Sequence, residues 1–219
     1  MLRRLGQETP MPLDLWLAFV AASTALLLIP GPTVLLVLSY ALSKGRGVAV
    51  ASATGVALGD LIAMSASLAG LGALVLASAT LFAVLKWVGA AYLLWLGYRL
   101  FRSAGGAGLA QMRVSQDVSA RSVLAHTAAV TALNPKSIAF FIAFVPQFLR
   151  PEAPLLPQFA ILIATFVGLA ALNALAYALL ADRLRRWVDR PSVIAGLTRT
   201  GGVTLMGMGL ATALLRRPA

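Results

Sequence analysis

Apolar stretches long enough to cross a lipid bilayer follow one another along almost the whole of this chain. About 20 residues of α-helix cross the hydrocarbon core of a bilayer, because each residue adds about 1.5 Å to the helix. A helix also bonds its backbone N–H and C=O groups within itself, as lipid requires. The run lengths therefore predict an all-α, polytopic membrane protein.

Composition excludes several other classes of protein. Of the 219 residues, 60% are hydrophobic and 11% are charged, whereas an ordinary globular domain carries about 25% charged residues. The chain has no cysteine, which excludes a disulfide framework, a thiolate metal site and dithiol redox chemistry. The formal net charge of +11 does not indicate nucleic-acid binding, because the basic residues stand in short connectors beside apolar runs.

The apolar runs predict one membrane domain, residues 1–219, with six transmembrane helices. We expect the spans at residues 13–42, 48–77, 81–101, 123–149, 155–180 and 201–215. A Gly-rich polar connector at 102–121 divides the chain into halves at 13–101 and 122–215.

Basic residues precede the first apolar run, as they do in a signal peptide. An apolar region of a signal peptide has only about 7–15 residues, so we expect an uncleaved span.

The two halves share one pattern. The first span of each half is broken by proline, at Pro30-Gly31-Pro32 and at Asn134-Pro135. Because each half has three spans, the halves enter the membrane in opposite directions. Interrupted apolar segments at matching positions of two halves indicate an inverted-repeat transporter with its site near the membrane midplane. We therefore expect two inverted three-helix repeats.

Lysines and arginines near the span ends predict the orientation, because cytoplasmic loops carry an excess of them. Eleven of these residues stand in the connectors after the first, third and fifth spans, and six stand on the opposite side. We expect those three connectors in the cytoplasm and both termini outside.

Asp60 lies about a dozen residues into the second predicted span. An aspartate at a helix centre costs roughly 2.5–3.5 kcal/mol on insertion scales and typically is paired or faces water. One interpretation is a carboxylate that binds a proton or a substrate ammonium. The alternatives are a structural ion pair, or a helix end that lies nearer the surface.

The motif Pro30-Gly31-Pro32 removes two backbone donors and permits unusual dihedral angles at the glycine. A helix that restarts after Pro32 presents free N–H groups around Thr33 and the positive end of its dipole. Such an end can bind an anionic group such as a carboxylate. A simple helix kink is the alternative.

The motif Asn134-Pro135 is typical of an N-cap followed by proline at the first helical position, and it predicts a second half-helix start. Lys136 follows directly, far from either end of its span. Its ammonium could bind a substrate carboxylate, pair with Asp60, or reach the membrane interface along its flexible stem.

Other polar and small residues in the spans indicate a functional role less strongly. Asn173, in the fifth span, is a candidate for the pathway of substrate or ion, or a hydrogen-bonded bridge between helices. His126, the only histidine, has no carboxylate–histidine spacing around it, so we expect an interfacial residue and no metal site. Four glycines are expected where helices pack closely: Gly55, Gly59, Gly89 and Gly97.

At these residues the chain resembles the LysE/RhtB family of bacterial amino-acid exporters. The matching stretches are, in order, Pro30-Gly31-Pro32, Lys44-Gly45-Arg46-Gly47, Gly55 to Asp60, Lys86 to Leu93 with Leu96-Gly97, Leu133 to Lys136, and Pro146-Gln147-Phe148. The resemblance covers the chain from about Leu13 to Leu215. Any one motif is weak, but the ordered set is specific.

The resemblance implies a protein of the bacterial inner membrane that exports amino acids or close derivatives, driven by protons, with no cofactor. It does not identify the amino acid, and oligomerisation stays open. An intramembrane protease is disfavoured, because the chain lacks a Gly-x-Ser-Gly motif. A membrane scaffold or assembly protein without transport, and an exporter of another small solute or metal ion, remain as alternatives.

Overall fold

The computed structural model describes residues 11–44, 48–77, 79–103, 119–150, 152–181, 183 and 190–214. Every regular element within those residues is a helix. The all-α prediction is therefore confirmed for the part of the chain that the structure describes.

The first half contains a broken helix followed by two continuous ones. Its elements are α1 (Leu13–Leu28), α2 (Pro32–Lys44), α3 (Ala49–Ala77) and α4 (Ala79–Arg102). The predicted first span is thus two helices, whose axes differ by 56°. The second helix begins at Pro32, where proline's fixed φ suits the first helical position and its missing N–H costs no bond.

The second half repeats this order. Its elements are α5 (Ala120–Ala132), α6 (Pro135–Ala139), the π-helix η3 (Phe140–Phe144), the 3-10 helix η4 (Val145–Phe148), α7 (Leu155–Leu179) and α9 (Pro191–Leu214). The break before Pro135 bends the path by 41°. The helix α9 begins at Pro191, well before the expected residue 201. Arg199 and Thr200, which look like connector residues, are exposed on its surface.

Length and composition identify fewer spans than the six predicted. Within the residues searched, α7 and the segment Ala49–Gly72 of α3 are each long and apolar enough to cross a membrane. The bent pair α1–α2 qualifies as one further span, and so does α5 with the helices that follow it. The structure therefore supports two to four candidate spans, and six spans stay a prediction.

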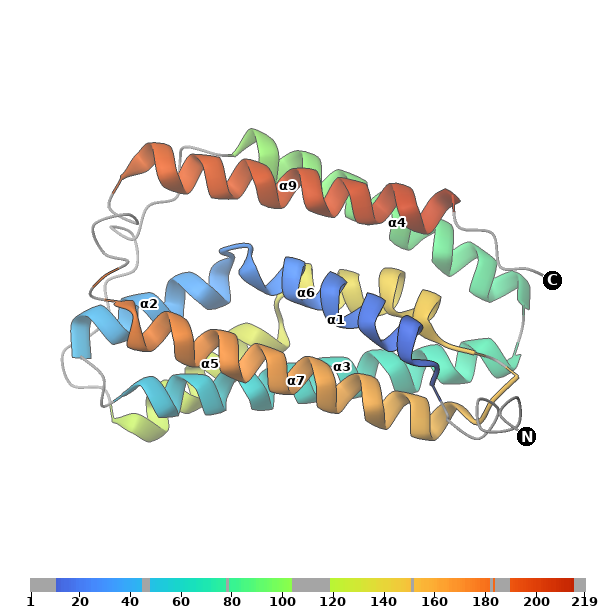
Figure 1. The fold of residues 1–219 in the computed structure, drawn as a ribbon, viewed down its shortest axis with the longest axis horizontal. Coiled ribbons are helices and arrows are strands. Elements are labelled where there is room, and N and C mark those ends of the chain that lie inside the picture. The colour runs from blue at the N-terminus through green and yellow to red at the C-terminus, as the bar shows by residue number, and fades with distance from the viewer. Residues whose placement is uncertain are drawn as a thin grey trace.

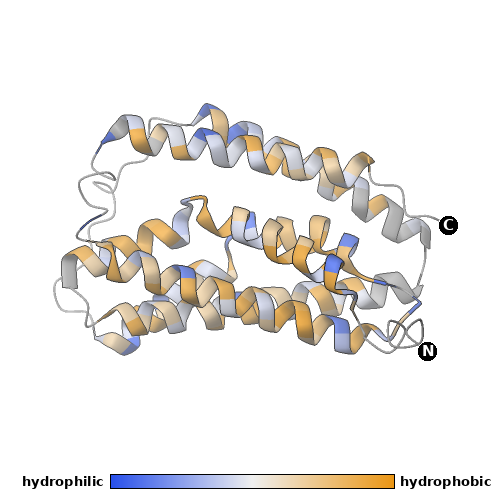
Figure 2. Ribbon diagram, in the orientation of Figure 1, coloured by the Kyte–Doolittle hydropathy of each residue, from blue (hydrophilic) through white to orange (hydrophobic). Residues whose placement is uncertain are grey.

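The helices form two groups that lie beside each other. In Figure 1, α4 and α9 run side by side in opposite directions along one side of the molecule, and they pack chiefly on each other. The other group contains α3, which packs on α5 and α7, together with the broken α1–α2. Figure 2 shows helices that are mostly apolar, with the most hydrophilic residues gathered toward their ends.

Phenylalanine rings pack the segment after the second break against α1 and α7. Phe140 and Phe141 of η3 are fully buried, as are Phe166 of α7 and Phe19 of α1. The rings of Phe141 and Phe166 meet edge-on at 4.8 Å between centroids, an arrangement favoured by the quadrupoles of the two rings. Phe19 meets Phe148 in the same way at 5.3 Å. These contacts fix the segment after the second break between α1 and α7.

Close helix contacts occur at glycines. A Cβ atom at Gly59 would lie 2.6 Å from the carbonyl oxygen of Ala128, so α3 and α5 approach too closely for a larger residue. Gly55 has a similar contact one turn earlier, against Leu124. The other two predicted packing glycines, Gly89 and Gly97, contact Ala143 and Gly202 respectively. Only hydrogen fits at such contacts, which lets the backbones approach.

We predict that Gly202→Ala weakens the α4–α9 contact. A Cβ atom at residue 202 would lie 2.5 Å from the carbonyl oxygen of Gly97. Overpacking of this kind costs about 1–3 kcal/mol, so the thermal unfolding midpoint in detergent should fall. Gly207→Ala is the matched control on the same helix, because a Cβ there meets nothing within 4 Å. Equal midpoints for the two variants would contradict the close packing.

Candidate functional site

Both helix breaks border one cavity inside the helix bundle. Its lining includes Gly31 and the polar side chains of Thr33, Asp60, Asn134, Lys136 and Asn173. Side chains such as Leu26, Val37 and Ala170 make up an apolar wall. The cavity has a volume of about 30 Å³, which is room for roughly two water molecules.

The C-terminal end of α1 is held by side chains of the second half. Lys136 Nζ donates to the carbonyl oxygens of Leu26 at 3.1 Å and Ile29 at 3.0 Å. Asn173 Nδ2 donates to the oxygen of Leu27 at 3.1 Å, and Tyr177 Oη donates to the oxygen of Leu28 at 3.1 Å. The last carbonyls of a helix lack partners within it. Here four successive carbonyls find partners on α6 and α7.

The residues of the first break shape the site in different ways. Gly31 and Thr33 line the cavity, whereas Pro30 and Pro32 do not. Pro30 is buried and Pro32 is exposed. The backbone of Gly31 does not have a left-handed φ, and a Cβ atom there would lie at an ordinary distance of 3.4 Å from Lys136 Nζ. In this conformation the break therefore depends on the two prolines more than on the freedom of glycine.

Asn134 joins the second break to the first. Its Oδ1 accepts from the backbone N–H of Lys136 at 3.0 Å, so the predicted N-cap is present. Its Nδ2 donates to Thr33 Oγ1 at 3.2 Å, at the start of α2. Pro135 takes the first helical position and is exposed to the exterior of the protein. One amide thus caps one half-helix and contacts the start of the other.

Asp60 lies on α3 at the cavity and is only 2% exposed. In the described part of the chain, its Oδ1 has no hydrogen-bond partner. Lys136 lines the same cavity, but its ammonium donates to the carbonyls of α1. A buried polar atom without a partner is costly. Asp60 is therefore ready to accept a proton or a ligand that donates a hydrogen bond.

Three polar residues near this site were not predicted from the sequence. Thr131 and Ser137 line the cavity, and Tyr177 bonds the end of α1. Tyr177 lies one helical turn after Asn173, so both belong to one face of an otherwise apolar helix. The four-residue spacing of Asn173 and Tyr177 could therefore have predicted that both side chains face the site. The pairing of Lys136 with backbone carbonyls had no such signal, because every residue has a carbonyl.

His126 lies apart from the cavity lining. It is exposed, and its Nδ1 lies 2.7 Å from the hydroxyl of the buried Tyr40. Within the described residues, no group of three or more His, Cys, Asp or Glu side chains could hold a metal ion. The polar chemistry of the cavity itself comes from one carboxylate, one ammonium, amides and hydroxyls.

Comparisons with known proteins agree on one family. The family model "LysE type translocator" matches residues 24–216. A homoserine/homoserine lactone efflux protein of Salmonella typhimurium is 34% identical over 94% of this chain and 99% of its own length. An uncharacterized membrane protein of Vibrio cholerae is 32% identical over 91% of this chain and 97% of its own length.

A leucine efflux protein of Enterobacter sp. is 27% identical over 92% of this chain and 95% of its own length. No solved structure matches the chain. The family match covers most of the sequence, including both helix breaks and Asp60. This chain therefore belongs to the LysE type translocator family and is a multi-pass membrane protein.

Proposed function

We propose that this protein exports amino acids or close derivatives across the bacterial inner membrane in exchange for protons. Its relatives include proteins named for efflux of homoserine and of leucine. The observation that carries the proposal is the cavity between the two helix breaks, with the carboxylate of Asp60 and the ammonium of Lys136 in its lining. An amino acid is a zwitterion, so its two charged groups match this pair.

The substrate carboxylate binds Lys136 and the N-terminal end of α2. Thr33 lies in the first turn of α2 and lines the cavity, where the helix dipole favours an anion. Asp60 binds either the substrate ammonium or the counter-moving proton. If substrate and proton compete for this carboxylate, export of one requires entry of the other. The unpartnered Oδ1 of Asp60 supports this role.

The cavity is small in this conformation. Space for about two water molecules is too small for an amino acid. Binding must therefore enlarge the cavity, and the two breaks are the points where the helices that border it can change direction. The bends of 56° and 41° at these breaks support a hinge role.

The packing supports two inverted repeats with six spans. In each half the order is a broken helix, a long helix and another long helix. The second helices of the halves, α3 and α7, pack on each other, and so do the third helices, α4 and α9. Such pairing of like with like is expected about a two-fold axis in the membrane plane.

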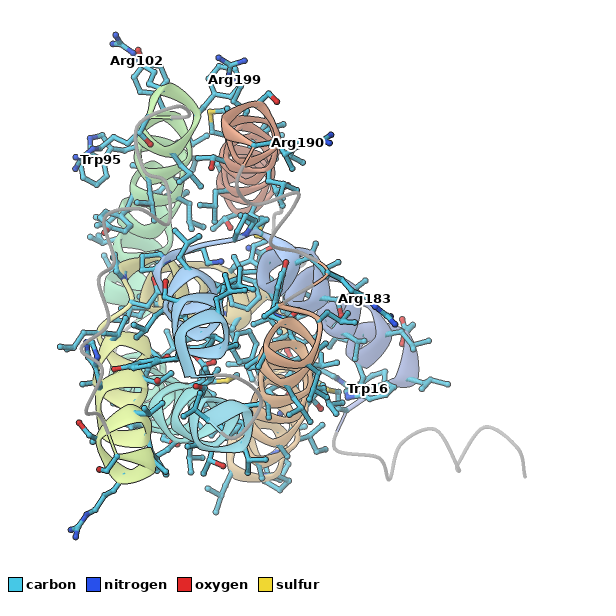
Figure 3. The ribbon with its side chains drawn as sticks, turned by 90° about the vertical axis from the view of Figure 1, so that its left-hand side faces the viewer. Trp16, Trp95, Arg102, Arg183, Arg190 and Arg199 are labelled. Carbon is cyan, nitrogen blue, oxygen red and sulfur yellow. The ribbon has the colours of Figure 1, made fainter. Side chains whose placement is uncertain are left out.

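The distribution of arginines supports a cytoplasmic location for one end of the bundle. The ends of α2, α4 and α7 point toward the left-hand side of Figure 1. Figure 3 views the molecule from that side, with Arg102, Arg183 and Arg190 pointing outward. By the excess of basic residues we assign this side to the cytoplasm, and both termini to the other side.

The proposed function is tested by counterflow. Purified protein in liposomes preloaded with one unlabelled amino acid should take up the same labelled amino acid, for at least one member of a panel that includes homoserine and leucine. Protein-free liposomes are the control. A folded protein that exchanges no member of the panel would overturn the proposal in favour of a membrane protein without amino-acid transport.

We predict that Asp60→Asn abolishes transport driven by a pH gradient in proteoliposomes, because an amide cannot carry the counter-moving proton. If Asp60 carries only the proton, counterflow without a gradient continues; if it binds the substrate ammonium, counterflow falls as well. Asp14→Asn is the matched control, since Asp14 is an exposed carboxylate at the start of α1. Unchanged gradient-driven transport in Asp60→Asn would remove this residue from the coupling mechanism.

The proposed orientation is tested by single-cysteine labelling, because the chain has no cysteine of its own. Ser103 follows α4 and Glu152 precedes α7, and both are exposed. A membrane-impermeant maleimide should modify Ser103→Cys only in inside-out vesicles and Glu152→Cys only in right-side-out vesicles. Modification of both from one side would contradict the proposed arrangement of spans.

A further inference from the structure

The ammonium of Lys136 occupies a site built for a primary amine. Two backbone carbonyls, of Leu26 and Ile29, accept its N–H groups at 3.1 and 3.0 Å. Leu26 lies in the last turn of the 16-residue helix α1 and Ile29 is its C-cap, and the helix dipole favours a cation at this end. This end borders the cavity through Leu26. The protein thus holds a primary ammonium at the helix end with its own side chain.

The site does not depend on Lys136 for its shape. The intervening carbonyls of Leu27 and Leu28 are held independently by Asn173 and Tyr177 of α7. If Lys136 moves away, these two bonds keep the end of α1 in place. The carbonyls of Leu26 and Ile29 then remain oriented to accept another N–H donor.

We propose that these two carbonyls are the subsite for the primary ammonium of the substrate, and that Lys136 occupies it until substrate arrives. This inference rests on the proposed function and deepens it. When substrate binds, its ammonium takes the carbonyls and Lys136 turns to the substrate carboxylate. One ammonium replaces another at the helix end, so the charge there is unchanged. The departure of Lys136 also frees space in a cavity that is too small for substrate.

This exchange assigns different tasks to the two ionisable residues of the cavity. Lys136 binds the substrate carboxylate, and the carbonyls of α1 bind the ammonium. Asp60 is then left to the counter-moving proton. The unpartnered Oδ1 of Asp60 fits this task, because no other group in the described structure bonds to it.

The test is chemical complementation of Lys136→Met, which empties the carbonyl site. Ethylammonium should raise the thermal unfolding midpoint of this variant in detergent by about 2–4 °C at a few times its Kd. It should not raise that of the wild type, whose site is occupied. Tetramethylammonium has the same charge but no N–H donor and should have no effect on either. An equal response to both cations, or none to ethylammonium, would overturn the proposal.

The double variant Lys136→Met/Asp60→Asn decides between the two acceptors. If the carbonyls bind the amine, the response to ethylammonium persists. If Asp60 binds it, the response disappears and the proposed subsite is wrong. This readout is stability and not transport, so its failure is distinguishable from failure of the counterflow experiment.

A second measurement uses the wild type and does not require that the variants fold. In counterflow, an amino acid that is transported should compete at least about tenfold better than its N-trimethyl derivative, because loss of the N–H groups removes two charge-assisted hydrogen bonds. Equal competition by the two compounds would overturn the carbonyl subsite.

Discussion

The carbonyl end of α1 is the constraint on which the site depends. The last carbonyls of a helix lack partners within it, and a buried polar group without a partner costs about 1–3 kcal/mol. Lys136, Asn173 and Tyr177 meet this demand from the other half of the protein. The break in α1 is therefore stable only when the two halves are assembled, and the cavity exists where they meet.

Close packing elsewhere keeps that arrangement in place. At Gly59 the backbone of α3 lies against α5, the helix that leads to the second break. Asp60 follows Gly59 directly in sequence. The glycine thus sets how near α3 comes to α5, while the next residue reaches the cavity. A larger residue at this contact would displace the carboxylate together with the helix that carries it. The helix packing at Gly59 therefore determines the position of the carboxylate at Asp60.

The sequence predicted the features that depend on local chemistry. Proline positions located both breaks, Asn134 was identified as an N-cap, and Asp60 and Lys136 were identified as polar residues of one site. Features that depend on tertiary contacts could not be predicted from the sequence. The partner of Lys136 is a set of carbonyls that become available only because α1 ends nearby. The early start of α9 at Pro191 was missed because polar residues on a helix surface resemble a connector.

The two breaks are not equivalent, because the helix ends that border them are satisfied by different partners. The end of α5 is closed by its own backbone, with Leu133 N–H donating to Ala129 and Asn134 N–H donating to Thr131. The end of α1 has one comparable bond, from Ile29 to Leu26, and otherwise depends on side chains of the second half. Replacement of the Lys136 ammonium by that of a substrate therefore changes bonds at the first break and leaves the backbone bonds of the second intact. The rearrangement on substrate binding should therefore centre on the side chain of Lys136, while Asn173 and Tyr177 keep the end of α1 in place and α5 and α6 stay together.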